Sequence, residues 1–226
     1  MSLSVDAESF AELAVDLHEV TTPAETVERI VEFAAQILDC VYAGVILVHE
    51  GSRVETVASD HDVVSQLDLI QWEAGEGPDL DLIADRPCVI VRDVRTETRW
   101  PTWCAAVDAA GVRSMIGARL STTRQVLGSL NLYAHDVDAF GSHDLDVAHM
   151  LARHAAVALE AARGTEHLLR AIEARNLIGQ AQGILMERHG LDAGQAFAVL
   201  RRHSQHTNVK LHVVARQLIE TRSLPH

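Results

Sequence analysis

Basic side chains gather in residues 170–226 of this chain. Eight arginine and lysine residues lie there against four acidic residues, so this segment carries a net charge of +4. Because the whole chain has a formal charge of −13, residues 1–169 carry −17. A small basic module on an acidic carrier is the charge layout of a protein whose tail binds a polyanion such as nucleic acid. An ordinary helical subdomain that is slightly basic would give the same count, so charge alone leaves the function open.

Cysteines and catalytic motifs give little support to an enzyme. Cys40, Cys88 and Cys104 lack the Cys-x-x-Cys spacing of a zinc site or a redox pair, and no signal peptide precedes them. There is no Walker-type loop and no kinase or hydrolase motif. No run of about 18 apolar residues occurs, so no membrane span is expected. The sequence therefore predicts a cytoplasmic protein without catalytic residues.

Two groups of polar side chains allow more than one interpretation. His203 and His206 could contact one ion or one phosphate, but a polar helix end is the simpler explanation. The second group is an acidic stretch formed by Glu76, Asp79 and Asp81. A solvated loop is the simpler interpretation of this stretch, and a cation site is the alternative. No metal ligand is predicted in either place.

The sequence of the basic tail predicts three short helices. Apolar residues recur at helical spacing in the first, which stops at Gly190. A second helix is expected over residues 192–203, with Asp192 as its N-cap. A third is expected over residues 210–221, after a turn at Asn208. A bundle of about 55 residues buries little core alone, so it needs a neighbouring element.

The preceding part of the chain predicts one α+β domain. Strands are expected at residues 40–48, 54–58, 88–94, 114–121 and 126–134. Helices are expected at residues 23–38, with Thr22 as N-cap, at 61–72, and from about residue 144 onward. Only four residues separate the last two strands, which is short enough for a hairpin. Helices before and after an antiparallel sheet make this fold α+β.

The basic tail resembles the ANTAR module, the three-helix RNA-binding output domain of bacterial transcription antiterminators. The residues that carry the resemblance are Ala181, Gly183, Ile184, Leu185, Met186, Ala196, Leu200, Ser204, Leu211, Val214 and Ala215. One position departs from the family pattern, because Gln182 stands where lysine is common. The departure removes one charge that would bind phosphate and keeps a side chain that can hydrogen-bond to bases.

Residues 12–163 resemble a GAF domain, a sensory or dimerisation unit. The resemblance rests on Gly75-Glu76-Gly77-Pro78, on Asp93 with Arg99-Trp100-Pro101, on Gly111-Val112-Arg113-Ser114 and on Gly128-Ser129-Leu130-Asn131-Leu132-Tyr133. Ligands of GAF domains differ widely, so the fold does not supply one. No cofactor is evident, and an unknown small ligand in the GAF pocket is left open. Asp79 stands where such proteins commonly have cysteine, so thiol chemistry is not available at that position.

A seam of small and apolar residues connects the two parts. From Ala148 to Met186 its members follow at alternating steps of three and four, which is the spacing of a two-helix coiled coil. Over residues 151–159, packing on the domain's own sheet is an alternative explanation. The expected dimer contacts are Leu169, Ile172 and Asn176, of which the asparagine would fix the register. The predicted organisation is a GAF sensory domain at 12–163, a coiled-coil linker at 164–176 and an ANTAR RNA-binding domain at 170–226.

The ANTAR resemblance implies a signal-responsive antiterminator that stabilises paired hairpins in nascent RNA. Cations would bind stem phosphates, and polar side chains would contact loop bases. The candidate phosphate contacts are Arg175, Arg188, Arg201, Arg202 and Lys210. The candidate base contacts are Gln180, Gln182, Ser204, Gln205 and Asn208. The tail has no Trp or Tyr, and Phe197 falls on the apolar stripe, so arginine or histidine is expected to stack on bases.

A redox enzyme and a DNA-binding regulator are the two alternative functions. One branch of GAF proteins reduces free methionine sulfoxide with cysteines that face the pocket, and Cys88 and Cys104 could lie there. Asp79 replaces a thiol which that branch needs, and a basic tail would have no purpose in such an enzyme. DNA binding by a helix-turn-helix is disfavoured, because no short Gly-containing turn joins the second and third helices. The expected partners are RNA hairpins, a second copy of the chain, and a small-molecule or protein signal, with no membrane.

Overall fold

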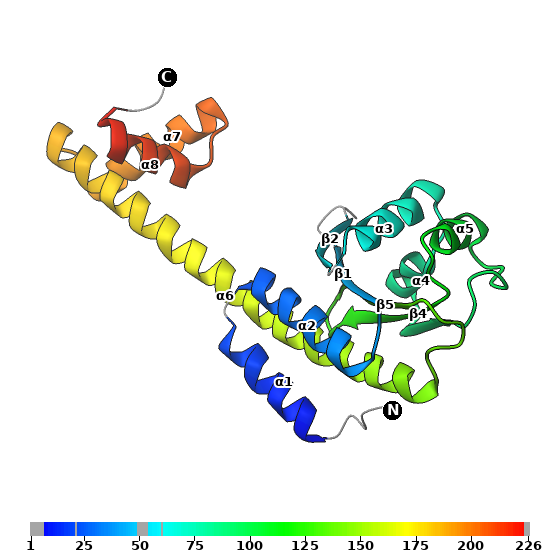
Figure 1. Cartoon of the computed structure of the whole chain (residues 1–226). Helices are drawn as coiled ribbons and strands as arrows, with labels where there is room; N and C mark the ends of the chain where they lie inside the picture. Colours follow the sequence, from blue (N-terminus) through cyan, green and yellow to red (C-terminus); the bar gives the residue numbers. More distant parts are fainter. Residues whose placement is uncertain (1–6, 21, 49–53, 60, 224–226) are drawn as a thin grey trace. The chain divides into compact units, whose positions relative to one another are not determined.

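The computed structural model describes residues 7–20, 22–48, 54–59 and 61–223. The chain divides into two compact units, Met1–Arg163 and Gly164–His226 (Figure 1). One helix, α6 (Ser142–His189), contributes residues to both units. Two apolar clusters form the core of the first unit and a third forms the core of the second. Each unit therefore has its own source of stability.

The first unit is built on a five-stranded antiparallel sheet with the strand order β2-β1-β5-β4-β3 (Figure 1). The strands are β1 (Tyr42–Val48), β2 (Val54–Ser59), β3 (Cys88–Val91), β4 (Ser114–Ser121) and β5 (Val126–Ala134). Side chains of the central strand β5 alternate between the two faces of the sheet. Leu130 and Leu132 belong to one apolar core, and Ser129 and Asn131 are buried under the other face.

Two helices cover the face of the sheet that carries Leu130, namely α2 (Pro23–Ile37) and the first part of α6. A third helix, α1 (Ala7–Glu19), packs against α2 and adds Leu13 and Leu17 to the same core. The Thr22 side chain accepts a hydrogen bond from the backbone N–H of Glu25, and Pro23 occupies the first turn of α2. Both features favour a helix start, so the predicted N-cap is confirmed. The buried stripe of α2 packs against the sheet through residues such as Ile30.

Three other helices cover the opposite face of the sheet. They are α3 (Asp62–Ala74), α4 (Pro78–Ala84) and α5 (Pro101–Ala109). The sequence did not predict α4 or α5, because each is short and is marked only by a proline in its first turn. Between α3 and α4, Gly77 has a φ of 152°, and a Cβ there would lie 2.2 Å from Gln71 Oε1. Glycine is therefore required for α4 to start so close to α3.

The second unit is a three-helix module formed by the last part of α6 with α7 (Ala193–Thr207) and α8 (Leu211–Thr221). Its core consists of Ala181, Leu185, Ala196, Leu200, Val214, Ala215 and Leu218. Asp192 and Gln195 form a reciprocal capping box that starts α7. The predicted end of this helix near His203 is wrong, because α7 continues to Thr207. Asn208, in the left-handed conformation with a φ of 55°, then ends it.

The predicted seam has two different environments along α6. Ala148, Leu151 and Ala155 are buried in the core of the first unit. For this stretch the alternative explanation is confirmed, because packing against the sheet accounts for the spacing and the interpretation as a dimer seam is wrong. By contrast, Leu169 and Ile172 are 61% and 50% exposed. Among the described helices, including all of α6, none combines the length and apolarity that spanning a membrane requires.

Candidate functional site

The predicted phosphate contacts of the second unit are all exposed to solvent. They are Arg175, Arg188, Arg201, Arg202 and Lys210. Arg188, near the end of α6, also donates a hydrogen bond to the backbone carbonyl of Arg222, the residue that ends α8. This guanidinium therefore joins the ends of two helices and retains further N–H donors for a ligand.

The outer face of α7 combines an aromatic ring with cationic and amide side chains. We define the outer α7 face as Phe197, Arg201, Arg202 and Gln205, all of which are exposed. Phe197, Arg201 and Gln205 follow at steps of four, so they form one row along the helix. Phe197 is 37% exposed and lies outside the core of the second unit. The prediction that Phe197 packs in the core is therefore wrong, and its ring is available for stacking on a base.

Two predicted base contacts form hydrogen bonds within the second unit. The Gln182 side chain donates from Nε2 to the carbonyl of Ala193 at 3.0 Å, joining α6 to the start of α7. The Ser204 hydroxyl donates to the carbonyl of Val209 at 2.6 Å and closes the turn between α7 and α8. Both side chains hold the connections between helices. Gln180, Gln205 and Asn208 are exposed.

A shallow groove runs along one flank of α7. Its volume is about 320 Å³, and it is lined by Val199, Arg202, His203 and His206. The structure therefore brings the two histidines together with an arginine, as a phosphate contact would require. Nε2 of His203 is buried and has no hydrogen-bond partner within the described residues. The groove adjoins the outer α7 face, because Arg202 belongs to both.

In the first unit, Asp79 lies at the centre of a buried polar cluster. Its carboxylate accepts hydrogen bonds from Gln71 Nε2 at 2.5 Å, Ser129 Oγ at 2.6 Å and Asn131 Nδ2 at 2.8 Å. The Asp79 side chain is fully buried. The interpretation of this residue as part of a solvated loop is therefore wrong. Asp79 belongs to α4 and faces the central strand β5.

The other two acidic residues of that stretch have separate roles. Glu76 Oε1 accepts from the backbone N–H groups of Thr102 and Trp103, at the start of α5. Asp81 pairs with Arg86 at 3.4 Å on the surface. Within the described residues, no group of three or more His, Cys, Asp or Glu side chains is arranged to hold a metal ion. The three carboxylates therefore do not form one site.

A second buried carboxyl lies beside Asp79. Asp68, on α3, is 2% exposed, and its Oδ2 accepts from the Thr56 hydroxyl at 2.7 Å. Burial raises the pKa of both carboxyl groups, and the negative charge of Asp79 raises the pKa of Asp68 further. The three donors around Asp79 favour its charged form. We therefore assign the negative charge to Asp79 and the proton to Asp68 in the unliganded cluster.

We expect Asp68→Asn to stabilise the chain at about pH 8 and to have little effect at about pH 3.5. A raised folded-state pKa means that the protonated carboxyl contributes stability at low pH, and that this contribution is lost as pH rises through the folded-state value. Each pKa unit of difference between folded and unfolded states corresponds to about 1.4 kcal/mol. Asparagine cannot ionise, so it avoids this loss.

Urea unfolding at both pH values measures the effect. Asp85→Asn, at an exposed position, is the matched control. A pH-independent difference for Asp68→Asn would contradict the assignment.

The cysteines do not face a common pocket. Cys88, on β3, packs toward α6, and its Sγ lies 3.2 Å from Nδ1 of His149. Cys104, on α5, is buried in the core on the opposite face of the sheet. Burial raises the pKa of each thiol to about 11. The idea that Cys88 and Cys104 could serve one redox pocket is therefore wrong, since the sheet separates them.

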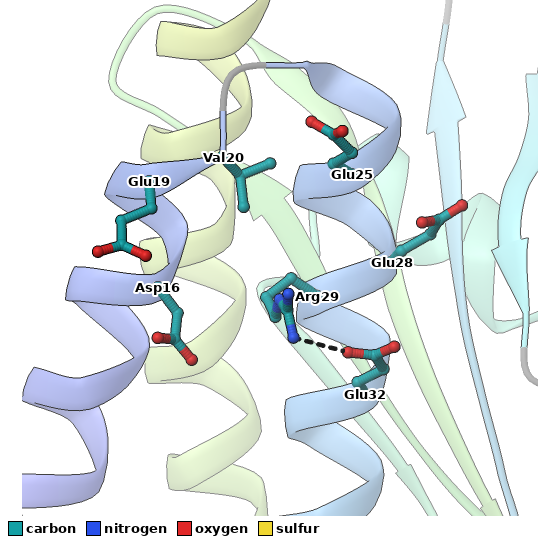
Figure 2. A pocket seen from close by; sticks show the side chains of 7 residues that line it. All are labelled: Asp16, Glu19, Val20, Glu25, Glu28, Arg29 and Glu32. Atoms are coloured by element: carbon teal, nitrogen blue, oxygen red, sulfur yellow. Dashed lines mark hydrogen bonds and ion pairs between the residues drawn. The ribbon is translucent and has the colours of Figure 1, made fainter.

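An acidic groove lies between α1 and α2 of the first unit. It is lined by Asp16, Glu19, Val20, Glu25, Glu28, Arg29 and Glu32, and Figure 2 shows these carboxylates gathered around one arginine. Arg29 pairs with Glu32 at 3.2 Å. The remaining carboxylates repel phosphates, so nucleic acid is excluded from this surface. The surfaces suited to a polyanion are those of the second unit.

Comparison with known proteins identifies both units. A GAF domain family model matches residues 20–160, and an ANTAR domain family model matches residues 166–219. Among curated proteins, none matches the chain. These matches, the five-stranded sheet and the three-helix module confirm the predicted α+β GAF fold, followed by a long helix and an ANTAR module.

Solved structures share the fold of the first unit. A domain of a two-component sensor histidine kinase protein from Sinorhizobium meliloti 1021 is 18% identical with a TM-score of 0.54, covering 65% of this chain and 96% of its own. The cyanobacteriochrome TePixJ GAF domain is 14% identical with a TM-score of 0.57, covering 65% and 94%. The Stigmatella aurantiaca phytochrome photosensory core module is 13% identical with a TM-score of 0.62, covering 95% and 47%. At these identities the likeness concerns the fold alone.

Proposed function

The chain belongs to the GAF domain family and carries an ANTAR domain after it, and from this pairing we propose that it is a signal-responsive transcription antiterminator. In this proposal the ANTAR domain binds paired hairpins in nascent RNA, and stabilising them prevents a competing terminator hairpin from forming. The GAF domain receives the signal. The chain thus acts as a regulator and carries out no catalysis of its own.

The outer α7 face is the observation that supports RNA as the partner. Single-stranded loop bases are recognised by stacking on aromatic or guanidinium planes and by hydrogen bonds to their edges. Phe197 offers a plane for stacking, and Gln205 offers an amide in the same row. Arg202 and the adjoining histidine groove offer cations for the phosphates on either side of a loop base. In the first unit, by contrast, Arg92, Arg95 and Arg99 each pair with a carboxylate.

The candidate contacts divide by role. For stem phosphates we propose Arg175, Arg188, Arg201, Arg202 and Lys210. For loop bases we propose Gln180, Gln205 and Asn208, with Phe197 added as a stacking residue. Gln182 and Ser204 would act by holding α7 in place, because their hydrogen bonds to Ala193 and Val209 join it to the neighbouring helices.

Pairing of two chains is part of the proposal. Leu168, Leu169 and Ile172 are at least half exposed within little more than one turn of α6, and a second copy would bury them. Asn176, one turn farther, would fix the register of a parallel coiled coil. We propose residues 12–163 as the sensory domain, 164–176 as the dimeric linker and 170–226 as the RNA-binding domain. Two RNA-binding domains would then bind two hairpins of one transcript.

A transcription assay tests the antitermination step. Hairpins selected by the full chain from an RNA pool with randomised short loops would be placed so that the second hairpin overlaps an intrinsic terminator. We expect readthrough in single-round transcription to rise with protein concentration. A template whose terminator does not overlap either hairpin is the control. Tight hairpin binding with unchanged readthrough would refute antitermination while leaving RNA binding intact.

We expect Phe197→Leu to weaken binding of a selected hairpin by about fivefold, because one base loses its stacking partner and stacking contributes about 1–3 kcal/mol per base. The salt dependence should not change, since no charge is removed. Phe197→Tyr keeps the ring and should bind as the wild type does. Fluorescence polarisation measures all three affinities. Equal affinity for the leucine and tyrosine variants would show that the ring does not contact RNA.

A further inference from the structure

The buried polar cluster of the first unit lies between the central strand and two helices. We define it as Asp68, Gln71, Asp79, Ser129, Asn131 and Tyr133, each of which is at most 2% exposed. Ser129, Asn131 and Tyr133 follow at steps of two along β5, so they share one face of the sheet. The register pairs Asn131 with Gly44 on β1 and with Gly117 on β4. A glycine on each neighbouring strand therefore flanks the amide of Asn131.

Hydrogen bonds within the cluster fix the orientation of its members. Nδ2 of Asn131 donates to Oδ1 of Asp79 at 2.8 Å. Flipping this amide would bring two oxygen atoms together, so Oδ1 of Asn131 must be the atom that points away. Gln71 contacts Asp79 twice, because its Oε1 also accepts from the backbone N–H of Asp79 at 2.9 Å. The cluster is therefore rigid on the Asp79 side.

Three oxygen atoms of the cluster have no hydrogen-bond partner among the residues that the structure describes. They are Oδ1 of Asp68, Oδ1 of Asn131 and the Tyr133 hydroxyl. Leaving one buried polar group unpaired typically costs about 1–3 kcal/mol, so three in one cluster are a substantial cost. Polar groups in a folded core normally have partners, which is why unpaired ones indicate a bound molecule. A molecule that donates hydrogen bonds to all three atoms would remove this cost.

The charge of the cluster specifies the sign of that molecule. Two carboxyl groups lie in the cluster, and within the described residues no Lys, Arg or His side chain forms a hydrogen bond or an ion pair with either. Burial raises the pKa of the Tyr133 hydroxyl, and the proximity of both carboxyl groups raises it further. A buried negative charge without a counter-ion is unfavourable. A cation inside the cluster would offset it.

We propose that this cluster binds the ammonium group of a small primary amine. A primary ammonium has three N–H donors and one positive charge, which match the three unpaired oxygen atoms and the uncompensated charge. The inference rests on the proposed function and deepens it, because it gives the chemistry of the signal that the GAF domain receives. Binding between α3, α4 and β5 would offset the buried negative charge that Asp79 carries.

Calorimetric titration of the full chain tests this inference without RNA. Ammonium chloride and methylammonium chloride are the probes, and potassium chloride and tetramethylammonium chloride at equal ionic strength are the controls. Both control cations carry the same single positive charge as the probes but have no N–H group. They therefore test whether charge alone is sufficient for binding. We expect saturable binding of the two probes and at least tenfold weaker binding of both controls, as loss of hydrogen bonds to a charged group predicts.

The tyrosine hydroxyl allows a conservative variant. Tyr133→Phe removes only an atom that has no partner, so the fold should persist, and methylammonium affinity should fall about tenfold or more. Tyr42→Phe is the matched control, because Tyr42 pairs with Tyr133 across the sheet and is not fully buried. The methylammonium affinity of the Tyr42→Phe variant should equal that of the wild type. Asp68→Asn provides a second variant, which keeps the shape of the side chain and replaces its carboxyl group with an amide that cannot ionise.

Three results would overturn the inference. They are the absence of saturable binding by either probe, equal binding of a control cation, and unchanged affinity in Tyr133→Phe. Ordered water alone would then be the partner of the three oxygen atoms. Hairpin binding measured on the same protein separates this failure from failure of the proposed function. If the chain binds RNA but no amine, only the proposal of an amine ligand is rejected. If it binds the amine but no RNA, only the proposal of RNA binding by the ANTAR domain is rejected.

Discussion

Replacing both Leu169 and Ile172 by glutamate should reduce affinity for a two-hairpin RNA by about 100-fold or more, while binding of a single hairpin stays nearly unchanged. When two RNA-binding domains are joined, the second contact becomes intramolecular, and the gain in avidity is typically about 10²–10⁴-fold. Carboxylates facing each other in a buried seam would be unpaired and desolvated, so the two helices would separate. Light scattering reports the mass, and titration of one- and two-hairpin RNAs reports the affinities.

Met150→Glu with Val157→Glu is the matched control for that variant. Both residues are exposed apolar side chains of α6, at 46% and 63%, and both lie outside residues 164–176. We expect this control to remain dimeric with full avidity. A dimeric Leu169/Ile172 variant, or a wild-type chain that is monomeric at micromolar concentration, would remove the linker from the mechanism. Loss of the dimer in the control alone would assign the pairing to the GAF portion of α6.

Replacing both Arg201 and Arg202 by alanine should weaken hairpin binding roughly 20-fold at about 0.15 M salt, for all loop sequences alike. Each phosphate contact contributes about 0.7–0.9 to the slope of log affinity against log salt, so the slope should fall by about 1.4–1.8. Both guanidinium groups are exposed, and neither forms an ion pair with another described residue. They are therefore available to the phosphates. Polarisation titrations at several salt concentrations measure the slope.

Arg29→Ala with Arg86→Ala removes the same charge from the first unit. Arg29 pairs with Glu32 in the acidic groove, and Arg86 pairs with Asp81. This control should leave the slope and the affinity unchanged. If the Arg201/Arg202 variant keeps the wild-type slope, those arginines are solvated charges at the outer face of α7, and the RNA contacts lie elsewhere on the second unit.

Local patterns in the sequence were sufficient for much of the fold. The bounds of β4 and β5 agree with the prediction, because alternating side chains and a short turn specify a hairpin without distant information. The caps at Thr22 and Asp192 were also predicted, since capping depends on side chains within one turn. Helices α4 and α5 were missed, because elements of seven and nine residues carry too few apolar repeats to be recognised.

Long-range contacts account for what the sequence did not reveal. Asp79 was assigned to a solvated loop, and its partner Ser129 lies 50 residues later. The polar row of Ser129 and Asn131 alternates with Leu130 and Leu132, a pattern that by itself predicts a solvated second face, so the burial of that face could not be predicted. Heptad spacing at Leu151 could not distinguish packing on a sheet from packing on a second helix, because both require one apolar face.

The central claim is that the ANTAR domain of this chain binds RNA hairpins. It is tested most directly by competition between a labelled hairpin RNA with a short loop and a DNA duplex of the same stem sequence, at about 0.15 M salt. The account predicts that unlabelled hairpin displaces the label at concentrations at least tenfold lower than the duplex DNA. It also predicts that Phe197→Leu narrows this gap, because the loop is what distinguishes the two. Equal or stronger competition by the DNA duplex would contradict it.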